Sequence, residues 1–230
     1  MNITDRLIAL DPTLERHNEG FWNEPYDPQK GGFSSFNDAG VECEVGEFLY
    51  SLIRLLKPNR VLETGTHIGV GAAYMGMALK DNNFGTLDTI EFLLELQEQA
   101  IKRIQKLELM NRVNIRFGDV KNFEPINFGL GNKDIYQLIF LDTEPQTRFR
   151  EMVRFSGYLA RGGFLFIHDL HRHMGQNSHN PDHPEDPHWP WGAIPEEMRK
   201  LVIEQFRPFH FKTPRGLTGF YKTAEEDYIW

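Results

Sequence analysis

Short apolar runs alternate with stretches of helical periodicity through the middle of the chain. The runs read RVLET (60–64), GTLDTIE (85–91), VNIRFG (113–118), YQLIFLD (136–142) and GGFLFIHD (162–169). Helices are predicted between them near 70–81, 93–109 and 146–160. Strands that alternate with helices of this length indicate right-handed βαβ crossovers, so we predict a parallel core with helices on both faces.

The flanking segments are expected to extend this core. Apolar residues at helical spacing predict a helix in VECEVGEFLYSLIRLL (41–56), which Pro58 stops. After the core, 195–206 predicts a helix, and PFHFKT (208–213) and GLTGFYKT (216–223) predict two strands that pair antiparallel through a tight turn. The fold class is therefore α/β, with a mostly parallel seven-stranded sheet closed by a C-terminal hairpin.

The polar lead-in, residues 1–40, has turn signals at EPYDPQKGG and is predicted to be an N-terminal cap on a main domain at 41–230. The chain has 230 residues, which suits one sizeable core, and its apolar and charged fractions of 40% and 25% are ordinary. Apolar runs fall short of the ~20 residues of a membrane helix, and the start does not read as a secretion signal. We therefore expect a cytoplasmic protein that neither spans nor binds a membrane.

Charge and cysteine content narrow the function. The net charge of −8 argues against a nucleic-acid-binding face, because such faces carry a basic patch. The single cysteine, Cys43, cannot form an internal disulfide. These features favour small-molecule chemistry.

A glycine-rich turn follows the first predicted strand, in VLETGTHIGVGAAYMG (61–76). A turn of this kind lets a ligand approach the backbone at the carboxyl edge of the sheet. The dinucleotide fingerprint G-x-G-x-x-G would need glycine at His67 and Val70, and no Gly-Lys-Ser/Thr follows for a phosphate loop. What remains is the pattern E-x-G-x-x-x-G, formed by Glu63, Gly65 and Gly69.

With this turn, VLETGTHIG, GTLDTIEF, VNIRFGDV, IFLDTEP and LARGGFLFIHDL occur in the order of five motifs of one family. The chain resembles the S-adenosylmethionine-dependent methyltransferases with the Rossmann-like fold. It is most similar to the small-molecule O-methyltransferases of the catechol and caffeoyl-CoA kind and of the antibiotic-sugar (macrocin) kind. The resemblance covers residues 41–170 and the terminal hairpin, and it implies transfer of a methyl group to a hydroxyl of a small molecule.

The resemblance also implies a binding site for S-adenosylmethionine. In it, Glu91 accepts hydrogen bonds from both ribose hydroxyls, Phe92 covers the adenine, Asp119 accepts from the adenine amino group and Glu63 orients the ammonium. The full set of implied cofactor-binding residues is Glu63, Gly65, Thr66, His67, Gly69, Glu91, Phe92, Gly118, Asp119 and Asp142.

At the reacting end, Asp142 ends the fourth predicted strand and Asp169 ends the fifth. Neighbouring strand ends lie about 5 Å apart, so the two carboxylates can hold a hard cation such as Mg²⁺, which is the metal role that the resemblance implies. Asp142 is also a candidate catalytic residue. Two departures from the catechol kind weigh against the metal: Leu170 replaces an asparagine, and TEPQTRF lacks the lysine that follows the fourth strand. Glu144 or a histidine can complete the ligand set, and Pro145 is predicted to begin the next helix.

A histidine-rich stretch follows Asp169. His171 and His173 are candidate general bases, because a histidine near its ordinary pKa suits proton transfer. His168 is predicted to be a hydrogen-bonded, partly buried structural residue. The spacing does not match the zinc pattern H-E-x-x-H and no cysteine lies nearby, so a zinc site is disfavoured.

Four prolines then exclude regular structure, and residues 171–192 are predicted to form a lid or substrate wall, against the alternative of a solvent-exposed loop. The aromatic tail EEDYIW can dock on the chain's own core or on a second copy, which leaves a homo-oligomer open. Other functions also stay open: a metal-independent enzyme acting on an amine or carboxylate, and a non-catalytic S-adenosylmethionine-binding protein. An amino-methyltransferase of nucleic acids is disfavoured, because LDTEPQ lacks the Asn/Asp-Pro-Pro-aromatic motif that stacks a flipped base.

Overall fold

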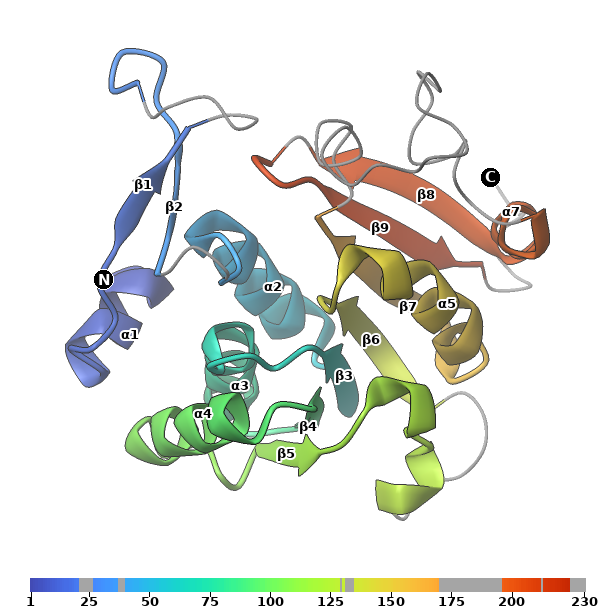
Figure 1. Ribbon diagram of the computed structural model, residues 1–230, viewed down its shortest axis with the longest axis horizontal. Helices are drawn as coiled ribbons and strands as arrows, with labels where there is room; N and C mark the ends of the chain where they lie inside the picture. Colours follow the sequence, from blue (N-terminus) through green and yellow to red (C-terminus); the bar gives the residue numbers. More distant parts are fainter. Residues whose placement is uncertain are drawn as a thin grey trace. The chain divides into compact units, whose positions relative to one another are not determined.

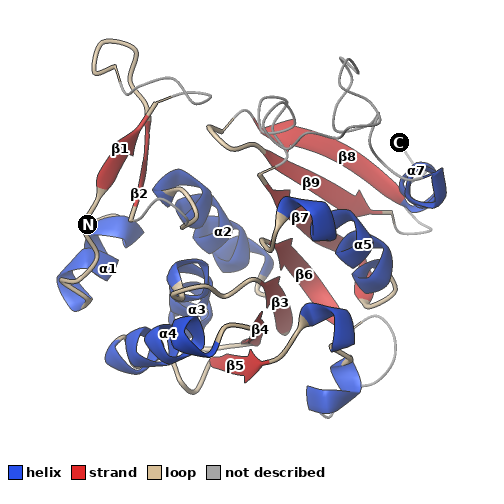
Figure 2. Cartoon of the chain, viewed as in Figure 1, coloured by secondary structure: helices blue, strands red, loops and turns tan. Residues whose placement is uncertain are grey.

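A computed structural model describes residues 1–20, 27–36, 40–128, 130, 135–169, 196–211 and 213–223 (Figures 1 and 2). The chain forms two compact units, Met1–Glu124 and Pro125–Trp230. Its main sheet has seven strands in the order β5-β4-β3-β6-β7-β9-β8. This sheet confirms the predicted fold class.

The N-terminal unit begins with elements that the sequence analysis did not predict. Helix α1 spans Ile3–Leu10, and strands β1 (His17–Glu19) and β2 (Phe33–Ser35) pair antiparallel. The side chain of Asn2 caps α1 by accepting from the backbone N–H of Asp5 at 2.7 Å. The helix is short, and packing of its buried Ile3 and Leu7 stabilises it more than helix propensity does.

Helix α2 (Cys43–Leu56) confirms the predicted amphipathic helix and packs against α3 (Val70–Asn82) (Figure 1). Its buried face carries Val45, Leu49 and Ile53 at four-residue spacing. A Cβ atom on Gly46 would lie 2.4 Å from the ring of Tyr74. Glycine at this position therefore permits the close approach of α2 and α3.

Three parallel strands form the sheet of this unit: β3 (Arg60–Thr64), β4 (Thr86–Glu91) and β5 (Val113–Phe117). Helix α3 packs on β4, and α4 (Leu94–Lys106) packs on β4 and β5. A short 3-10 turn, η1 (Val120–Asn122), follows β5. Since Thr64 aligns with Ile90 and Glu91 with Phe117, the carboxyl ends of all three strands lie at one edge.

The C-terminal unit continues after the 3-10 turn η2 (Pro125–Phe128) with β6 (Tyr136–Leu141), α5 (Pro145–Ser156) and β7 (Leu159–His168). Helix α7 (Glu196–Gln205) leads into β8 (Phe206–Phe211) and β9 (Leu217–Lys222). Strands β6 and β7 pair in parallel, and β9 pairs antiparallel with both β7 and β8. The predicted C-terminal hairpin is thus confirmed.

The predicted boundaries differ most around α5. The helix begins at Pro145, as predicted, but it ends at Ser156 rather than near residue 160. Strand β7 begins at Leu159, so Gly162 and Gly163 lie within the strand, whereas the prediction placed them at its start. A Cβ atom on Gly163 would lie 2.9 Å from the carbonyl oxygen of Gln137, so this glycine allows β7 to run close to β6.

Candidate functional site

The glycine turn of the N-terminal unit connects β3 to α3 through left-handed backbone. Gly65, His67 and Gly69 have φ values of 80°, 50° and 83°. A Cβ atom on Gly69 would lie 3.1 Å from the Cα atom of Ala100 in α4. Glycine at position 69 therefore suits the left-handed backbone, and a side chain there would crowd α4.

The Glu91 carboxylate at the end of β4 holds this turn from one side. Its Oε2 atom accepts from the backbone N–H of His67 at 2.7 Å, and its Oε1 atom accepts from those of Phe92 and Leu93 at 3.0 and 2.9 Å. The residue is 4% exposed. Because each carboxylate oxygen has two acceptor positions, Oε2 keeps one for a ligand hydroxyl.

A row of buried, hydrogen-bonded polar side chains lies next to the turn. Glu63 accepts from the hydroxyl of Thr89 at 2.6 Å, and the hydroxyls of Thr89 and Thr66 lie 2.6 Å apart. Glu63 and Thr66 are 1% and 2% exposed. Thr89 was not among the predicted site residues; its only sequence signal is a polar residue in a buried strand.

The remaining predicted residues of this unit lie at the ends of β4 and β5. Phe92 is 55% exposed and offers an open aromatic face. Gly118 donates its backbone N–H to the carbonyl oxygen of Glu91 at 2.9 Å, and a Cβ atom there would meet nothing within 4 Å. Asp119 is exposed and accepts from the backbone N–H of Lys121 at 2.8 Å. The nine predicted cofactor-binding residues of this unit therefore gather at one edge of β3, β4 and β5.

An ion-pair network that includes α4 contacts the glycine turn after β3. Arg103 of α4 donates to the carbonyl oxygen of Ile68 within the turn and to Asp11 at 3.0 Å. Lys106 donates to the same Asp11 carboxylate at 2.7 Å. Burial alone would raise the pKa of Asp11, but hydrogen bonds from Lys106, Thr13 and Arg103 lower it to about 2. The sequence analysis missed this network, because its members are far apart along the chain.

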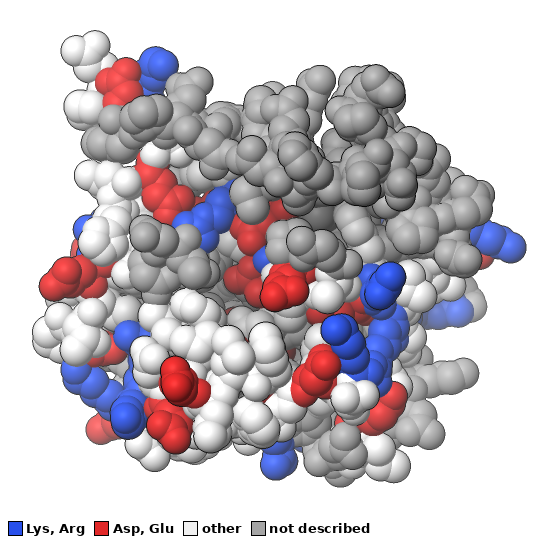
Figure 3. Space-filling model, in the orientation of Figure 1, with Lys and Arg blue, Asp and Glu red and all other residues white. Residues whose placement is uncertain are grey.

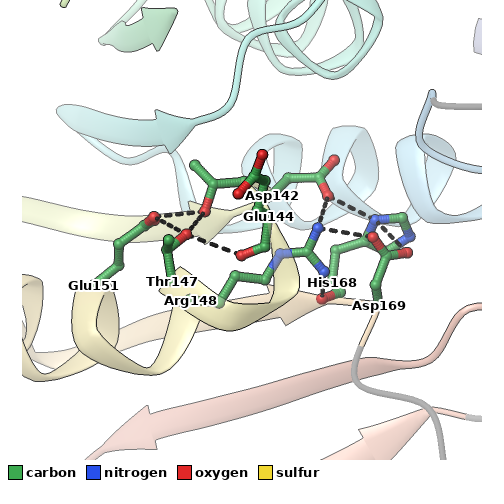
Figure 4. Close-up of polar contacts among 8 residues, drawn as sticks. Asp142, Glu144, Thr147, Arg148, Glu151, His168 and Asp169 are labelled. Atoms are coloured by element: carbon green, nitrogen blue, oxygen red, sulfur yellow. Dashed lines mark hydrogen bonds and ion pairs between the residues drawn. The ribbon is translucent and has the colours of Figure 1, made fainter. Parts of the chain in front are cut away.

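In the C-terminal unit, two aspartates lie beside a histidine, as Figure 4 shows. Asp142 follows β6, Asp169 follows β7, and the register of Leu141 with Ile167 brings the two strand ends level. The Nδ1 atom of His168 is 2.8 Å from Asp142 Oδ1 and 3.3 Å from Asp169 Oδ1. His168 was predicted to be hydrogen-bonded and partly buried; it is hydrogen-bonded, and at 1% exposed it is fully buried.

An arginine that the sequence analysis did not consider joins the two carboxylates. The Nη2 atom of Arg148 in α5 is 2.7 Å from Asp169 Oδ2 and 3.4 Å from Asp142 Oδ1 (Figure 4). Its Nη1 atom donates to the carbonyl oxygen of His168. Burial alone would raise the pKa of Asp169, but the charges of His168, Arg148 and Arg215 and the hydrogen bond from Arg148 lower it.

Arg148 is directed inward by its position on α5. It is in phase with Met152 and Phe155, four and seven residues later, and both are fully buried. A charged residue in phase with an apolar stripe is the sequence signal that identifies it. At the start of the helix, the hydroxyl of Thr147 lies 3.0 Å from Glu151 Oε1 (Figure 4). The hydroxyl of Thr143 lies 2.5 Å from the same oxygen, and these contacts stabilise the turn after β6.

Several predictions fall outside the described residues. They are the candidate bases His171 and His173, residue 170, the lid at 171–192 and the tail from residue 224. Glu144, the other candidate for completing a metal site, is exposed and serves as the N-cap residue of α5. Within the described part of the chain, the group with metal-ligand geometry is Asp142, His168 and Asp169.

The comparisons with known proteins agree with this architecture. A family model described as "Methyltransferase domain" matches residues 62–170, which run from β3 through the end of β7. No curated protein matches the chain.

Solved structures match over most of the chain at low sequence identity. The O-methyltransferase TomG from Streptomyces achromogenes, involved in tomaymycin synthesis and bound to S-adenosylmethionine, matches with a TM-score of 0.64 and 18% identity, covering 81% of this chain and 83% of that one. The O-methyltransferase from Bacillus cereus, with S-adenosylhomocysteine, gives 0.63 and 17%, covering 81% and 84%. The S-adenosylhomocysteine-bound methyltransferase PaMTH1 from Podospora anserina gives 0.62 and 16%, covering 96% of each chain.

Proposed function

We propose that this chain, a protein with the class I S-adenosylmethionine-dependent methyltransferase fold, moves a methyl group from S-adenosylmethionine to a hydroxyl of a small molecule. In the reaction, the acceptor oxygen forms a bond to the methyl carbon and the carbon–sulfur bond breaks. S-adenosylhomocysteine leaves with the electron pair, and a base takes the hydroxyl proton.

The observation that carries the proposal is the Glu91 carboxylate beside the glycine turn. It is held by three backbone N–H groups, and its Oε2 atom has an acceptor position left for a ribose hydroxyl. The turn, residues 65–69, carries no lysine or arginine, which suits a cofactor without phosphate groups. Phe92, exposed next to Glu91, can cover the adenine ring.

The charge of the chain and the names of similar structures support a small-molecule hydroxyl as the methyl acceptor. The net charge is −8, and on the face drawn in Figure 3 acidic and basic side chains of the described residues are interspersed. A nucleic-acid substrate would require a basic surface. Two of the similar structures are named O-methyltransferases, and this supports a hydroxyl acceptor.

None of the described helices is long and apolar enough to cross a membrane.

For the proton acceptor, His171, His173 and Asp142 remain the candidates. A divalent metal is a separate matter, because the fold family implies Mg²⁺ at Asp142 and Asp169. The arrangement does not fit that ion: the guanidinium of Arg148 already bridges the two carboxylates. No step of the proposed reaction therefore uses a metal.

Two measurements test the function. Calorimetry with S-adenosylhomocysteine should show binding to the wild-type chain, and Glu91→Ala should weaken it about a hundredfold through the loss of charge-assisted hydrogen bonds. Exposed Glu95 lies four residues later, and Glu95→Gln is the matched control, with unchanged affinity.

Transfer of a labelled methyl group to a panel of hydroxyl, amine and carboxylate compounds then identifies the acceptor. Product from hydroxyl compounds is expected. Absence of S-adenosylhomocysteine binding contradicts the proposal as a whole, whereas transfer confined to amines or carboxylates contradicts only the acceptor class.

A further inference from the structure

We propose that the guanidinium of Arg148 is the resident cation of the Asp142–Asp169 pair, so that this enzyme transfers its methyl group without a divalent metal. The proposal rests on the function proposed above and defines how the reacting end is built. Arg148 is thereby a positioning residue, which holds both carboxylates in place.

The guanidinium of Arg148 lies where a metal ion would have to bind the two carboxylates. Its Nη2 atom is 2.7 Å from Asp169 Oδ2 and 3.4 Å from Asp142 Oδ1. A Mg²⁺ ion bound by the same two oxygens needs contacts of about 2.1 Å and near-octahedral geometry. Such an ion would occupy the volume that the guanidinium fills, next to a second positive charge.

Burial of the Arg148 side chain also disfavours a metal at this site. The Arg148 side chain is 3% exposed, and those of Asp142 and Asp169 are 15% and 13% exposed. If a metal took the two carboxylate oxygens that face Arg148, the buried guanidinium would keep only the carbonyl oxygen of His168 as an acceptor, which is a costly state for a cation. With the arginine alone, two carboxylates and one guanidinium leave a single net negative charge beside His168.

The surrounding structure keeps Arg148 in this position. Its second terminal nitrogen donates to the carbonyl oxygen of His168, which is the last residue of β7. Helix α5 also packs against both β6 and β7. Asp169 has a φ of 54°, an uncommon left-handed conformation for a residue other than glycine, and its Oδ2 atom accepts from Arg148. The ends of β6 and β7 thus converge on the guanidinium that α5 supplies.

The exchange of a metal for an arginine changes the chemistry of the site. A guanidinium stays protonated and supplies a fixed charge, but it has no coordination sites with which to clamp a diol or lower a hydroxyl pKa. We therefore expect acceptors with a single hydroxyl to react as readily as vicinal diols.

A Mn²⁺ titration followed by electron paramagnetic resonance tests the proposal, because free Mn²⁺ has a strong signal that binding removes. The wild-type chain, with S-adenosylhomocysteine present, should bind Mn²⁺ more weakly than about 1 mM, and a chelator should not change methyl transfer. Arg148→Ala should bind Mn²⁺ at least about tenfold more tightly, because two unpaired carboxylates then attract it. Arg150→Ala, an exposed arginine on the same helix, is the matched control and should behave as wild type.

Two results overturn the proposal. One is stoichiometric Mn²⁺ binding by the wild-type chain that Asp142→Asn abolishes. The other is an Arg148→Ala variant that binds Mn²⁺ no better than wild type; if that variant does not fold, Arg148→Met replaces it at closer to the original volume. Calorimetry with S-adenosylhomocysteine on the same samples reports on the proposed function separately, since it does not depend on the cation.

Discussion

Asp11 links α1 to α4, and replacing it with asparagine should destabilise the N-terminal unit. The carboxylate is 2% exposed and is paired with Arg103 at 3.0 Å and Lys106 at 2.7 Å. Asparagine has nearly the same shape, so Asp11→Asn removes the charge while the packing is retained. Arg103 keeps its bond to the carbonyl oxygen of Ile68, but it loses its anionic partner.

The magnitude follows from the pKa of Asp11, which falls from 3.8 to about 2 in the folded chain. One pKa unit is worth about 1.4 kcal/mol, so the charged form contributes about 2 kcal/mol to the free energy of unfolding. Because the folded pKa is the lower one, this contribution is fully present above pH 5 and is lost as the pH falls from about 4 towards 2. At pH 3 about half of it should remain.

Urea unfolding followed by circular dichroism measures the difference between wild type and Asp11→Asn at pH 7 and at pH 3. We expect about 2 kcal/mol at pH 7 and about half of that at pH 3. Glu15→Gln removes an exposed carboxylate nearby and is the matched control, with little effect at either pH. A difference below about 0.5 kcal/mol at pH 7, or one equally large at both pH values, would refute the reasoning.

Three further changes test other parts of the N-terminal unit. Gly85→Ala should cost about 3 kcal/mol in urea unfolding, because φ is +79° and the new Cβ would lie 2.2 Å from the carbonyl oxygen of Pro58; an unchanged midpoint would contradict this. Tyr74→Phe should cost about 1 kcal/mol, because it removes the contact of 2.8 Å with the Thr4 hydroxyl, and a loss above about 3 kcal/mol would point to a larger role. Glu91→Gln should weaken S-adenosylhomocysteine binding about tenfold by calorimetry, because an amide nitrogen replaces one acceptor oxygen; unchanged affinity would exclude the ribose role.

The seven strands of the main sheet were predicted well from the sequence, whereas β1 and β2 were missed and the helix ends were predicted less well. Buried strands such as YQLIFL are short apolar runs, and the glycine turn after β3 marks where the first crossover begins. Helix α1 was missed because it has only eight residues and lies within a segment that was interpreted as a polar lead-in. The end of α5 was misplaced because Gly157 follows the helix without a strong change in polarity.

Some residues of the candidate site were predicted from the sequence and others were missed. Glu63, Gly69 and Glu91 stand at strand ends that the sequence itself marks, and the resemblance assigns them cofactor roles. Asp142 and Asp169 were likewise found as strand-end acids. Arg148 was not found. Its phase with Met152 and Phe155 indicates an inward position on α5, but the sequence does not show that two aspartates from other segments lie there.

The sequence by itself determined the order of strands and helices, the glycine turn and the acids at the strand ends, because hydrophobic period and turn residues act over short distances. Only the tertiary structure decided which charges meet. Arg148 reaches Asp169 across 21 positions and Arg103 reaches Asp11 across 92. The physical reason is that a buried charge must find an opposite one, and which partner is near depends on how helices pack on the sheet.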